Sequence, residues 1–266
     1  PIYSNSGITQ AEAKELNGII VIPMPFTINE QPFLEEIDLD QDGFYSFLGQ
    51  DAEVKTSQPA VGTVLDLWNN LLKEYDEIVH IPMSSGLSGS CETARLLAED
   101  FDGRVQVVNN QRISITQRRS VYDARALADK GFDAAAIRNI LERDKFESGI
   151  YIMVDTLKYL KKGGRVTPAA AAIGEILHIK PVLQIHGEKL DAFAKARNVK
   201  QAKTLMLNAV KKDIINHLGE LPPADAENAP AIAMAHTDNQ AEAEKWREEL
   251  QEEFPGYPIH IDPLSL

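Results

Sequence analysis

Short apolar segments alternate with amphipathic helical patterns along the first half of the chain, and this alternation restricts the possible folds more than any other feature. The apolar segments have the length of buried strands, and the helical patterns are long enough to carry the chain back across a sheet. Strands joined by such helices lie parallel, with helices covering both faces of the sheet. The expected strands are 19–23, 77–82 and 105–108, and the expected helices are 60–75, 90–101, 117–130 and 133–144.

The pattern changes near residue 148, where a second unit is expected to begin. Two apolar segments, 181–185 and 190–194, flank the turn sequence His-Gly-Glu-Lys, which is typical of an antiparallel hairpin. The other expected elements are a strand at 149–154, a helix capped by Asp155 or Thr156 and ended by Gly163 and Gly164, a helix opened by Thr167 and Pro168, a helix at 200–218, and a strand, helix and strand at 230–235, 239–253 and 258–262.

The fold class predicted from these elements is α/β, with two domains. The N-terminal α/β domain, residues 1–147, would hold a largely parallel sheet, and the C-terminal domain, residues 148–266, would be α+β. A chain of 266 residues with 44% hydrophobic content can bury cores for two such domains.

The composition also limits the functional class. No apolar run approaches the length needed to span a membrane, and the chain opens with Pro-Ile-Tyr-Ser, so we expect a cytoplasmic protein without stable membrane insertion. No His, Cys or carboxylate cluster has the spacing of metal ligands, and no cofactor is expected. The single cysteine, Cys91, is expected to be a small packing residue.

The net charge of −13 is distributed unevenly. Residues 158–212, the basic block, contain twelve Lys or Arg and three acids, a local balance of +9, so the rest of the chain carries −22. The overall charge argues against general nucleic-acid binding, because a phosphate backbone would be repelled by most of the surface. The basic block is either a solvated helix and hairpin surface or a surface for an anionic partner or phosphorylated group.

Two segments rich in hydroxyl side chains precede helical patterns: Lys-Thr-Ser-Gln-Pro at 55–59 and Ser-Ser-Gly-Leu-Ser-Gly-Ser at 84–90. Free backbone N–H groups and the positive end of the helix dipole meet at such places, so the two segments together would suit a carboxylate or a phosphate. The alternative is that the hydroxyls serve only as helix N-caps.

Four motifs resemble those of the DegV family of bacterial fatty-acid-binding proteins, and they occur in the same order over essentially the whole chain. They are Thr-Ser-Gln-Pro at 56–59, Ser-Ser-Gly-Leu-Ser-Gly at 84–89, Thr-Leu-Lys-Tyr-Leu-Lys-Lys-Gly-Gly-Arg at 156–165, and the segment from Ile-Lys-Pro-Val-Leu at 179–183 to Arg197. The resemblance implies two α/β domains with a long-chain fatty acid buried between them.

The resemblance also implies roles for particular residues. The fatty-acid carboxylate would be held by the hydroxyls of Thr56 and Ser88, with Ser57 and Ser85 nearby. Family members of known role present the fatty acid to a separate fatty acid kinase, which makes an acyl phosphate for phospholipid synthesis. Arg165 and Arg197, both in the basic block, correspond to arginines implicated in that partnership.

Two departures from the family pattern concern the ends of the chain. Family members usually open with an Asp-Ser pair and a further aspartate, whereas this chain has Ser-Asn-Ser-Gly at 4–7. The pattern also continues beyond the position of Leu266 into a glycine-rich turn with a histidine. We therefore expect either a longer natural chain or a missing wall of the site, and no histidine is assigned to the carboxylate.

A serine hydrolase or acyltransferase is the alternative from another class. The sequence Gly-Leu-Ser-Gly-Ser at 86–90 comes close to the Gly-x-Ser-x-Gly elbow, with Ser88 as the nucleophile, although Ser90 replaces the last glycine. The six histidines show no spacing that indicates a catalytic base. A nucleotide site at Gly163 and Gly164 lacks a Walker-type sequence. We therefore predict a lipid carrier that is not itself an enzyme.

Overall fold

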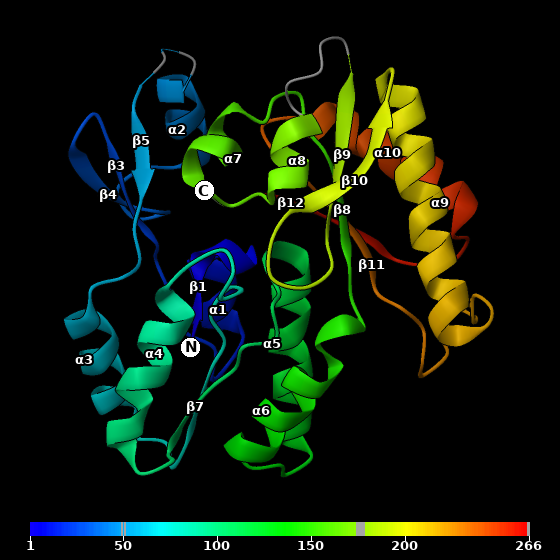
Figure 1. Cartoon of the computed structure of the whole chain (residues 1–266). Helices are drawn as coiled ribbons and strands as arrows, with labels where there is room; N and C mark the ends of the chain where they lie inside the picture. Colours follow the sequence, from blue (N-terminus) through cyan, green and yellow to red (C-terminus); the bar gives the residue numbers. More distant parts are fainter. Residues whose placement is uncertain (49, 51, 174–178, 265–266) are drawn as a thin grey trace. The chain divides into compact units, whose positions relative to one another are not determined.

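The structure is a computed structural model that describes residues 1–48, 50, 52–173 and 179–264. The chain forms two compact units (Figure 1). Unit 1 comprises Pro1–Asp144, Ile232–Phe254 and Ile259–Leu266, and unit 2 comprises Lys145–Ala231 and Pro255–Pro258.

The parallel sheet predicted for the first part of the chain is confirmed. In unit 1, β1 (Ile2–Tyr3) pairs with β2 (Val21–Ile22), and β6 (Ile78–His80) pairs with β7 (Val105–Val107), both in parallel. A parallel bridge between Ile2 and Ile81 connects the two pairs. The carboxyl ends of β6 and β7 therefore lie at the same edge, where ligands commonly bind in open α/β sheets.

Helices cover both faces of this sheet, because alternate side chains of each strand point to opposite sides. Ile78 and Val107 pack with the helices α3 (Val61–Leu71) and α4 (Ser90–Ala98) in a cluster around Trp68. Ile81 and Val108 pack in a second cluster, with the apolar faces of α5 (Ser114–Asp129), α6 (Ala134–Arg143) and α1 (Gln10–Glu15). Cys91 lies in the first cluster, and burial raises the pKa of its thiol to about 12, so it packs as an apolar residue.

Residues 25–56 contain elements that the sequence analysis did not anticipate. The strands β3 (Pro25–Ile28), β4 (Gln31–Leu34) and β5 (Val54–Thr56) form an antiparallel sheet with β3 in the centre, and α2 (Gln41–Leu48) packs beside it. The sheet buries Phe26 and Ile28 against Phe44. Strands of only three or four residues give little periodic signal, and β3 and β4 each include a proline, which is why this small sheet was missed. Short 3-10 turns occupy Ser4–Ser6, Glu99–Phe101 and Asp144–Phe146.

Unit 2 confirms the predicted hairpin. The strands β8 (Ile150–Met153), β9 (Lys180–Ile185) and β10 (Asp191–Ala196) form an antiparallel sheet in the order β10-β9-β8. The helix α9 (Val199–Leu218) packs on all three strands. Two short helices, α7 (Lys158–Gly163) and α8 (Pro168–Ile173), also lie in this unit, and Gly164 ends α7 with a φ of +69°, a left-handed conformation that glycine adopts readily.

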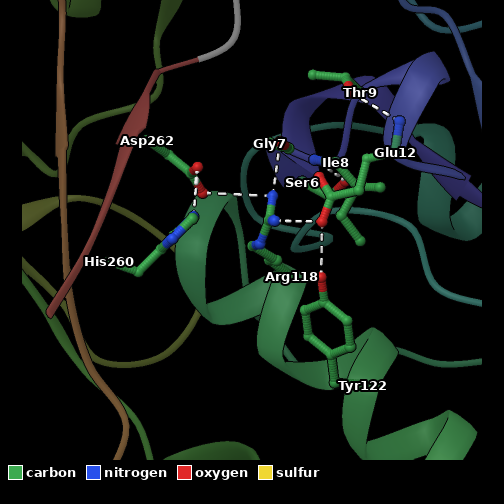
Figure 2. A network of polar contacts seen from close by, with 9 residues as sticks. All are labelled: Ser6, Gly7, Ile8, Thr9, Glu12, Arg118, Tyr122, His260 and Asp262. Carbon is green, nitrogen blue, oxygen red and sulfur yellow. Dashed lines mark hydrogen bonds and ion pairs between the residues drawn. The ribbon is translucent and has the colours of Figure 1, made fainter. Parts of the chain in front are cut away.

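The last strand, helix and strand were expected in a C-terminal domain beginning at 148, and here the structure groups the chain differently. β11 (Ile232–His236), α10 (Gln240–Glu253) and β12 (Ile259–Pro263) belong to unit 1, where β11 and β12 pair in parallel. α5 contacts β11, and Arg118 of α5 forms an ion pair with Asp262 of β12 (Figure 2). A single division at 147/148 does not allow the chain to re-enter unit 1 after unit 2. Contacts between residues far apart in the sequence determine which unit the last strands and helix join.

Candidate functional site

The first hydroxyl segment begins in a strand. Thr56 is the last residue of β5 and is exposed, and the N–H of Ser57 donates to the Pro25 carbonyl oxygen at 3.1 Å. The helix α3 that follows has Ala60 at its N-cap, and no side chain caps it. The capping alternative therefore does not explain the hydroxyls of Thr56 and Ser57.

The second hydroxyl segment, residues 84–90, forms a tight turn after β6. The N–H of Ser84 donates to the Arg112 carbonyl oxygen at 2.9 Å, and the Ser84 hydroxyl oxygen accepts from the N–H of Gly86 at 3.3 Å. The Ser88 hydroxyl oxygen accepts from the N–H of Ser90, the first residue of α4, at 3.2 Å. The Ser88 hydroxyl thus satisfies one of the backbone N–H groups at the start of α4, so the capping alternative applies to Ser88 in part.

The first hydroxyl segment lies close to Gly89 of the second segment and to Thr93 in the helix that follows it, and Gln58 makes the contact. The Thr93 hydroxyl of α4 donates to Gln58 Oε1 at 3.1 Å, and a Cβ placed on Gly89 would lie 3.8 Å from the same oxygen. α3 and α4 lie side by side (Figure 1). A small pocket opens at this junction. It is lined by Tyr3, Gln58, Pro59, Val61, Val64, Ser90, Thr93, Ala94 and Leu97.

The predicted carboxylate-binding hydroxyls differ in whether their protons already donate to a protein acceptor. Ser85 Oγ accepts from Asn109 Nδ2 at 2.9 Å, and Ser88 Oγ accepts from the Ser90 N–H, so both hydroxyl protons remain available to donate to a ligand. Ser57 Oγ instead donates to the Pro25 carbonyl oxygen, through a long contact of 3.5 Å. Ser85 and Ser88 are therefore better prepared than Ser57 to donate to an anion.

Behind the serine turn lies a buried group of rings that carries no charge. His80, at the end of β6, is fully buried, and its Nδ1 accepts from Trp68 Nε1 at 3.3 Å. Burial lowers the pKa of His80 well below its usual value, so the imidazole stays neutral. Burial also raises the pKa of Tyr3, whose ring packs edge-on against His80. The buried rings that precede the serine turn in β1 and β6 and pack on α3 therefore carry no charge.

Arg165 and Arg197 belong to unit 2, and the structure places them at opposite ends of one strand. The Arg165 carbonyl oxygen accepts from the N–H of Leu190, just before β10, whereas Arg197 follows the last residue of β10. Six residues of extended chain separate these positions, roughly 20 Å. The Arg165 side chain folds back, and its Nη1 donates to the Gly163 carbonyl oxygen at 2.6 Å. A Cβ at residue 163 would lie 3.1 Å from Nη1, so glycine leaves the space for this contact.

The hydrolase alternative requires a histidine beside Ser88, and the structure gives the described histidines other partners. His80 accepts from Trp68, His186 stacks on Phe146, His217 pairs with Glu147, His236 contacts Gln240, and His260 pairs with Asp262. His178 lies outside the described residues. Within the described part of the chain, no histidine is recorded as a partner of the Ser88 hydroxyl, and no group of three metal-ligating side chains occurs.

Asn109 is a hydrogen-bond partner of the serine turn that the sequence analysis missed. It directly follows the segment expected as a strand at 105–108, just as the serine turn follows β6. Since these parallel strands end at the same edge of the sheet, this position could have indicated a neighbour of the serines. The Ser-Asn-Ser sequence at 4–6, where the family pattern has aspartates, is buried: the Ser4 hydroxyl donates to Glu35, and Asn5 Nδ2 donates to Gln117 Oε1 at 3.1 Å.

Comparison with known proteins gives a consistent result. A family model described as uncharacterised proteins of the DegV family matches residues 4–266. The chain is 31% identical over 251 residues to the protein DegV of Bacillus subtilis strain 168, an alignment that covers 92% of this chain and 84% of that protein. It is 27% identical over 252 residues to the DegV domain-containing protein SA1258 of Staphylococcus aureus strain N315, covering 94% of this chain and 87% of that protein.

Solved structures are similar over nearly the whole chain. A crystal structure of DegV from Bacillus subtilis, described as a fatty acid binding protein, has a TM-score of 0.82 with 27% identity, and covers 99% of this chain and 91% of that one. A structure of a DegV family protein from Thermus thermophilus, described by its fatty acid binding, has a TM-score of 0.83 with 26% identity and the same coverage.

Among the described residues, no helix combines the length and apolar character that crossing a bilayer requires.

Proposed function

The chain belongs to the DegV family, and we propose that it binds one long-chain fatty acid, with the carboxylate held by the hydroxyls of Thr56, Ser85 and Ser88 and with Ser57 nearby. The observation that carries this proposal is the state of Ser85 and Ser88, whose oxygens accept from N–H groups and whose protons remain available to an anion. The fatty acid binding of the related proteins from Bacillus subtilis and Thermus thermophilus supports the same ligand class.

The acyl chain and the carboxylate of such a ligand contribute differently to the free energy of binding. Burial of about fifteen methylene groups at roughly 0.8 kcal/mol each contributes a gross gain of order 12 kcal/mol, from which the ordering of a flexible chain must be subtracted. Removal of the carboxylate from water costs several kcal/mol unless its oxygens receive hydrogen bonds. The acyl chain therefore supplies affinity, and the hydroxyls make the buried position of the carboxylate tolerable.

The proposal is tested by comparing a fatty acid with its methyl ester, which has the same acyl chain but no anionic oxygen. After the protein is freed of lipid, the acid should bind at least about tenfold more tightly than the ester at pH 8, the difference expected when charge-assisted hydrogen bonds are lost. Competition against a fluorescent fatty acid measures both affinities. Equal affinities would show that the hydroxyl segments do not hold a carboxylate.

We further propose that the bound fatty acid is presented to a separate kinase, which phosphorylates the carboxylate to an acyl phosphate for phospholipid synthesis in the cytoplasm. Neutral hydroxyl donors suit this reaction. A buried arginine would hold the carboxylate as an ion pair, whereas hydroxyls stabilise it and leave an oxygen able to accept a phosphoryl group. The protein itself would then be a carrier and not an enzyme.

The basic block supports this partnership, because a surface with a local balance of +9 would attract an acidic or phosphorylated partner. The roughly 20 Å between the backbones at the two ends of β10 favours separate contacts for Arg165 and Arg197 with the partner over joint binding of one phosphate.

Arg165→Glu should slow the formation of acyl phosphate by the kinase without emptying the lipid site. The charge reversal replaces attraction by repulsion at the partner surface, so the rate should fall about tenfold or more at low salt and the defect should shrink as salt screens it. Arg104→Glu is a matched control, because this exposed arginine lies outside the basic block and gives the same change in charge. An equal effect of both substitutions, or a rate that does not depend on salt, would argue against a specific role for Arg165.

A further inference from the structure

The side chain of Asn109 makes two hydrogen bonds to one residue of the serine turn. Its Nδ2 donates to Ser85 Oγ at 2.9 Å, and its Oδ1 accepts from the N–H of Ser85 at 3.4 Å. Asn109 is in turn held by α6, since its own N–H donates to Glu142 Oε1 at 2.8 Å. These contacts all lie within unit 1, at the carboxyl ends of β6 and β7.

The orientation of the Asn109 amide follows from this pair of contacts. A backbone N–H can only donate, so the Asn109 atom that faces the N–H of Ser85 must be the oxygen. The nitrogen then faces the Ser85 hydroxyl, and an amide nitrogen only donates. The Ser85 oxygen is therefore the acceptor in this contact, and its proton is left for another partner.

We infer that Asn109 is a positioning residue that makes Ser85 a hydrogen-bond donor toward the ligand, and that it thereby favours a carboxylate over an uncharged alcohol of the same chain length. This inference rests on the proposed function, because the ligand is the fatty acid. Asn109 would thus select the head group of the ligand without touching the ligand itself. Asn109 acts through Ser85, whose hydroxyl direction it fixes.

Asn109→Asp inverts this arrangement with almost no change in shape. The aspartate keeps an oxygen for the N–H of Ser85, but its second oxygen replaces the amide nitrogen and must accept the Ser85 proton. Ser85 would then present lone pairs to the ligand, which repel a carboxylate and accept from the O–H of an alcohol. Asn109→Ala is a second variant that removes the contact without adding a charge.

The experiment measures the affinities of palmitic acid and hexadecanol for the lipid-free wild type, both Asn109 variants and Asn139→Asp. Asn139 is exposed on α6, where its side chain accepts from Arg138, so this control adds the same charge to the same unit at a side chain that is not bonded to Ser85. Intrinsic tryptophan fluorescence, which comes from Trp68 in the core of unit 1 and from Trp246 on α10, reports that each variant is folded.

We expect the ratio of acid affinity to alcohol affinity to fall about tenfold or more in Asn109→Asp, with a gain in alcohol affinity, and to fall less in Asn109→Ala. The ratio should not change in Asn139→Asp. A different result is expected if the lower ratio in Asn109→Asp comes only from repulsion between the new charge and the carboxylate. Alcohol affinity would then stay at the wild-type value, and Asn109→Ala would keep the wild-type ratio. This result would overturn the inference. A wild type that binds neither ligand would instead overturn the proposed function, and the inference with it.

Discussion

Replacement of Thr56 and Ser88 together by alanine should lower the affinity for a long-chain fatty acid about a hundredfold. Each hydroxyl would donate one hydrogen bond to an anionic oxygen, and such a bond contributes roughly 1.5–3 kcal/mol, so the lower end of this range gives about 3 kcal/mol for the two together. The acyl chain should still bind weakly, because its burial does not depend on the hydroxyls. Equilibrium titration of the lipid-free variant with a fatty acid measures the loss.

A matched double variant separates this effect from a general loss of hydroxyls. Thr63→Ala with Ser46→Ala removes one threonine and one serine hydroxyl from exposed positions on α3 and α2 of the same unit. It should bind the fatty acid as the wild type does. Unchanged lipid occupancy in the Thr56 and Ser88 variant, together with unchanged presentation to a kinase, would mean that the carboxylate is held elsewhere.

Arg118→Leu should destabilise unit 1 by about 3 kcal/mol, because it leaves partly buried acceptors without their cation. Figure 2 shows the Arg118 guanidinium between three partners: the Gly7 carbonyl oxygen at 2.9 Å, the Glu12 carboxylate, and Asp262 Oδ2 at 3.6 Å. The side chains of Arg118 and Asp262 are only 12% and 9% exposed. The free energy of unfolding in urea gives the measurement.

The next residue supplies the control for this prediction. Arg119 also lies on α5 and pairs with Asp123 at 2.8 Å, but its side chain is 58% exposed. Exposed ion pairs contribute roughly 0–1 kcal/mol, so Arg119→Leu should have a much smaller effect. Equal losses from the two substitutions would show that the network in Figure 2 does not hold α1, α5 and β12 together.

Gly7 also belongs to this network through its backbone. Its φ is +76°, and a Cβ at this position would lie 3.1 Å from Asp262 Oδ2. Glycine therefore allows both the turn and the close approach of the Asp262 carboxylate that Arg118 contacts. The chain segments tied in this way are far apart in the sequence, and no local pattern indicates that they meet.

The parallel sheet of unit 1 and the hairpin of unit 2 could be predicted because both follow from periodicity and turn residues. The apolar runs ending near Ile81 and Val108, separated by helical patterns, determine the strand pairing through local rules. The grouping of β11, α10 and β12 with unit 1 could not be predicted, because it depends on contacts such as that between Arg118 and Asp262. Local patterns carry no information about which of two units receives a late strand.

For the candidate site, the hydroxyl-rich segments before helical patterns indicated only the two regions 55–59 and 84–90, and the resemblance to the DegV family indicated Thr56, Ser57, Ser85 and Ser88 within them. The hydrogen bond from Thr93 to Gln58 places the first of these segments beside α4. The different states of these hydroxyls could not be predicted. They depend on which N–H group reaches each oxygen, and for Ser85 that group comes from Asn109, after a different strand.

The most direct test of the account is native mass spectrometry of the purified protein, followed by organic extraction and identification of what is released. The account predicts one fatty acid for each protein molecule, and the extracted acid would also show the preferred chain length. A protein that carries no lipid, and that takes up none when long-chain fatty acids are added, would contradict the account and would make Ser88 a candidate for tests of ester hydrolysis.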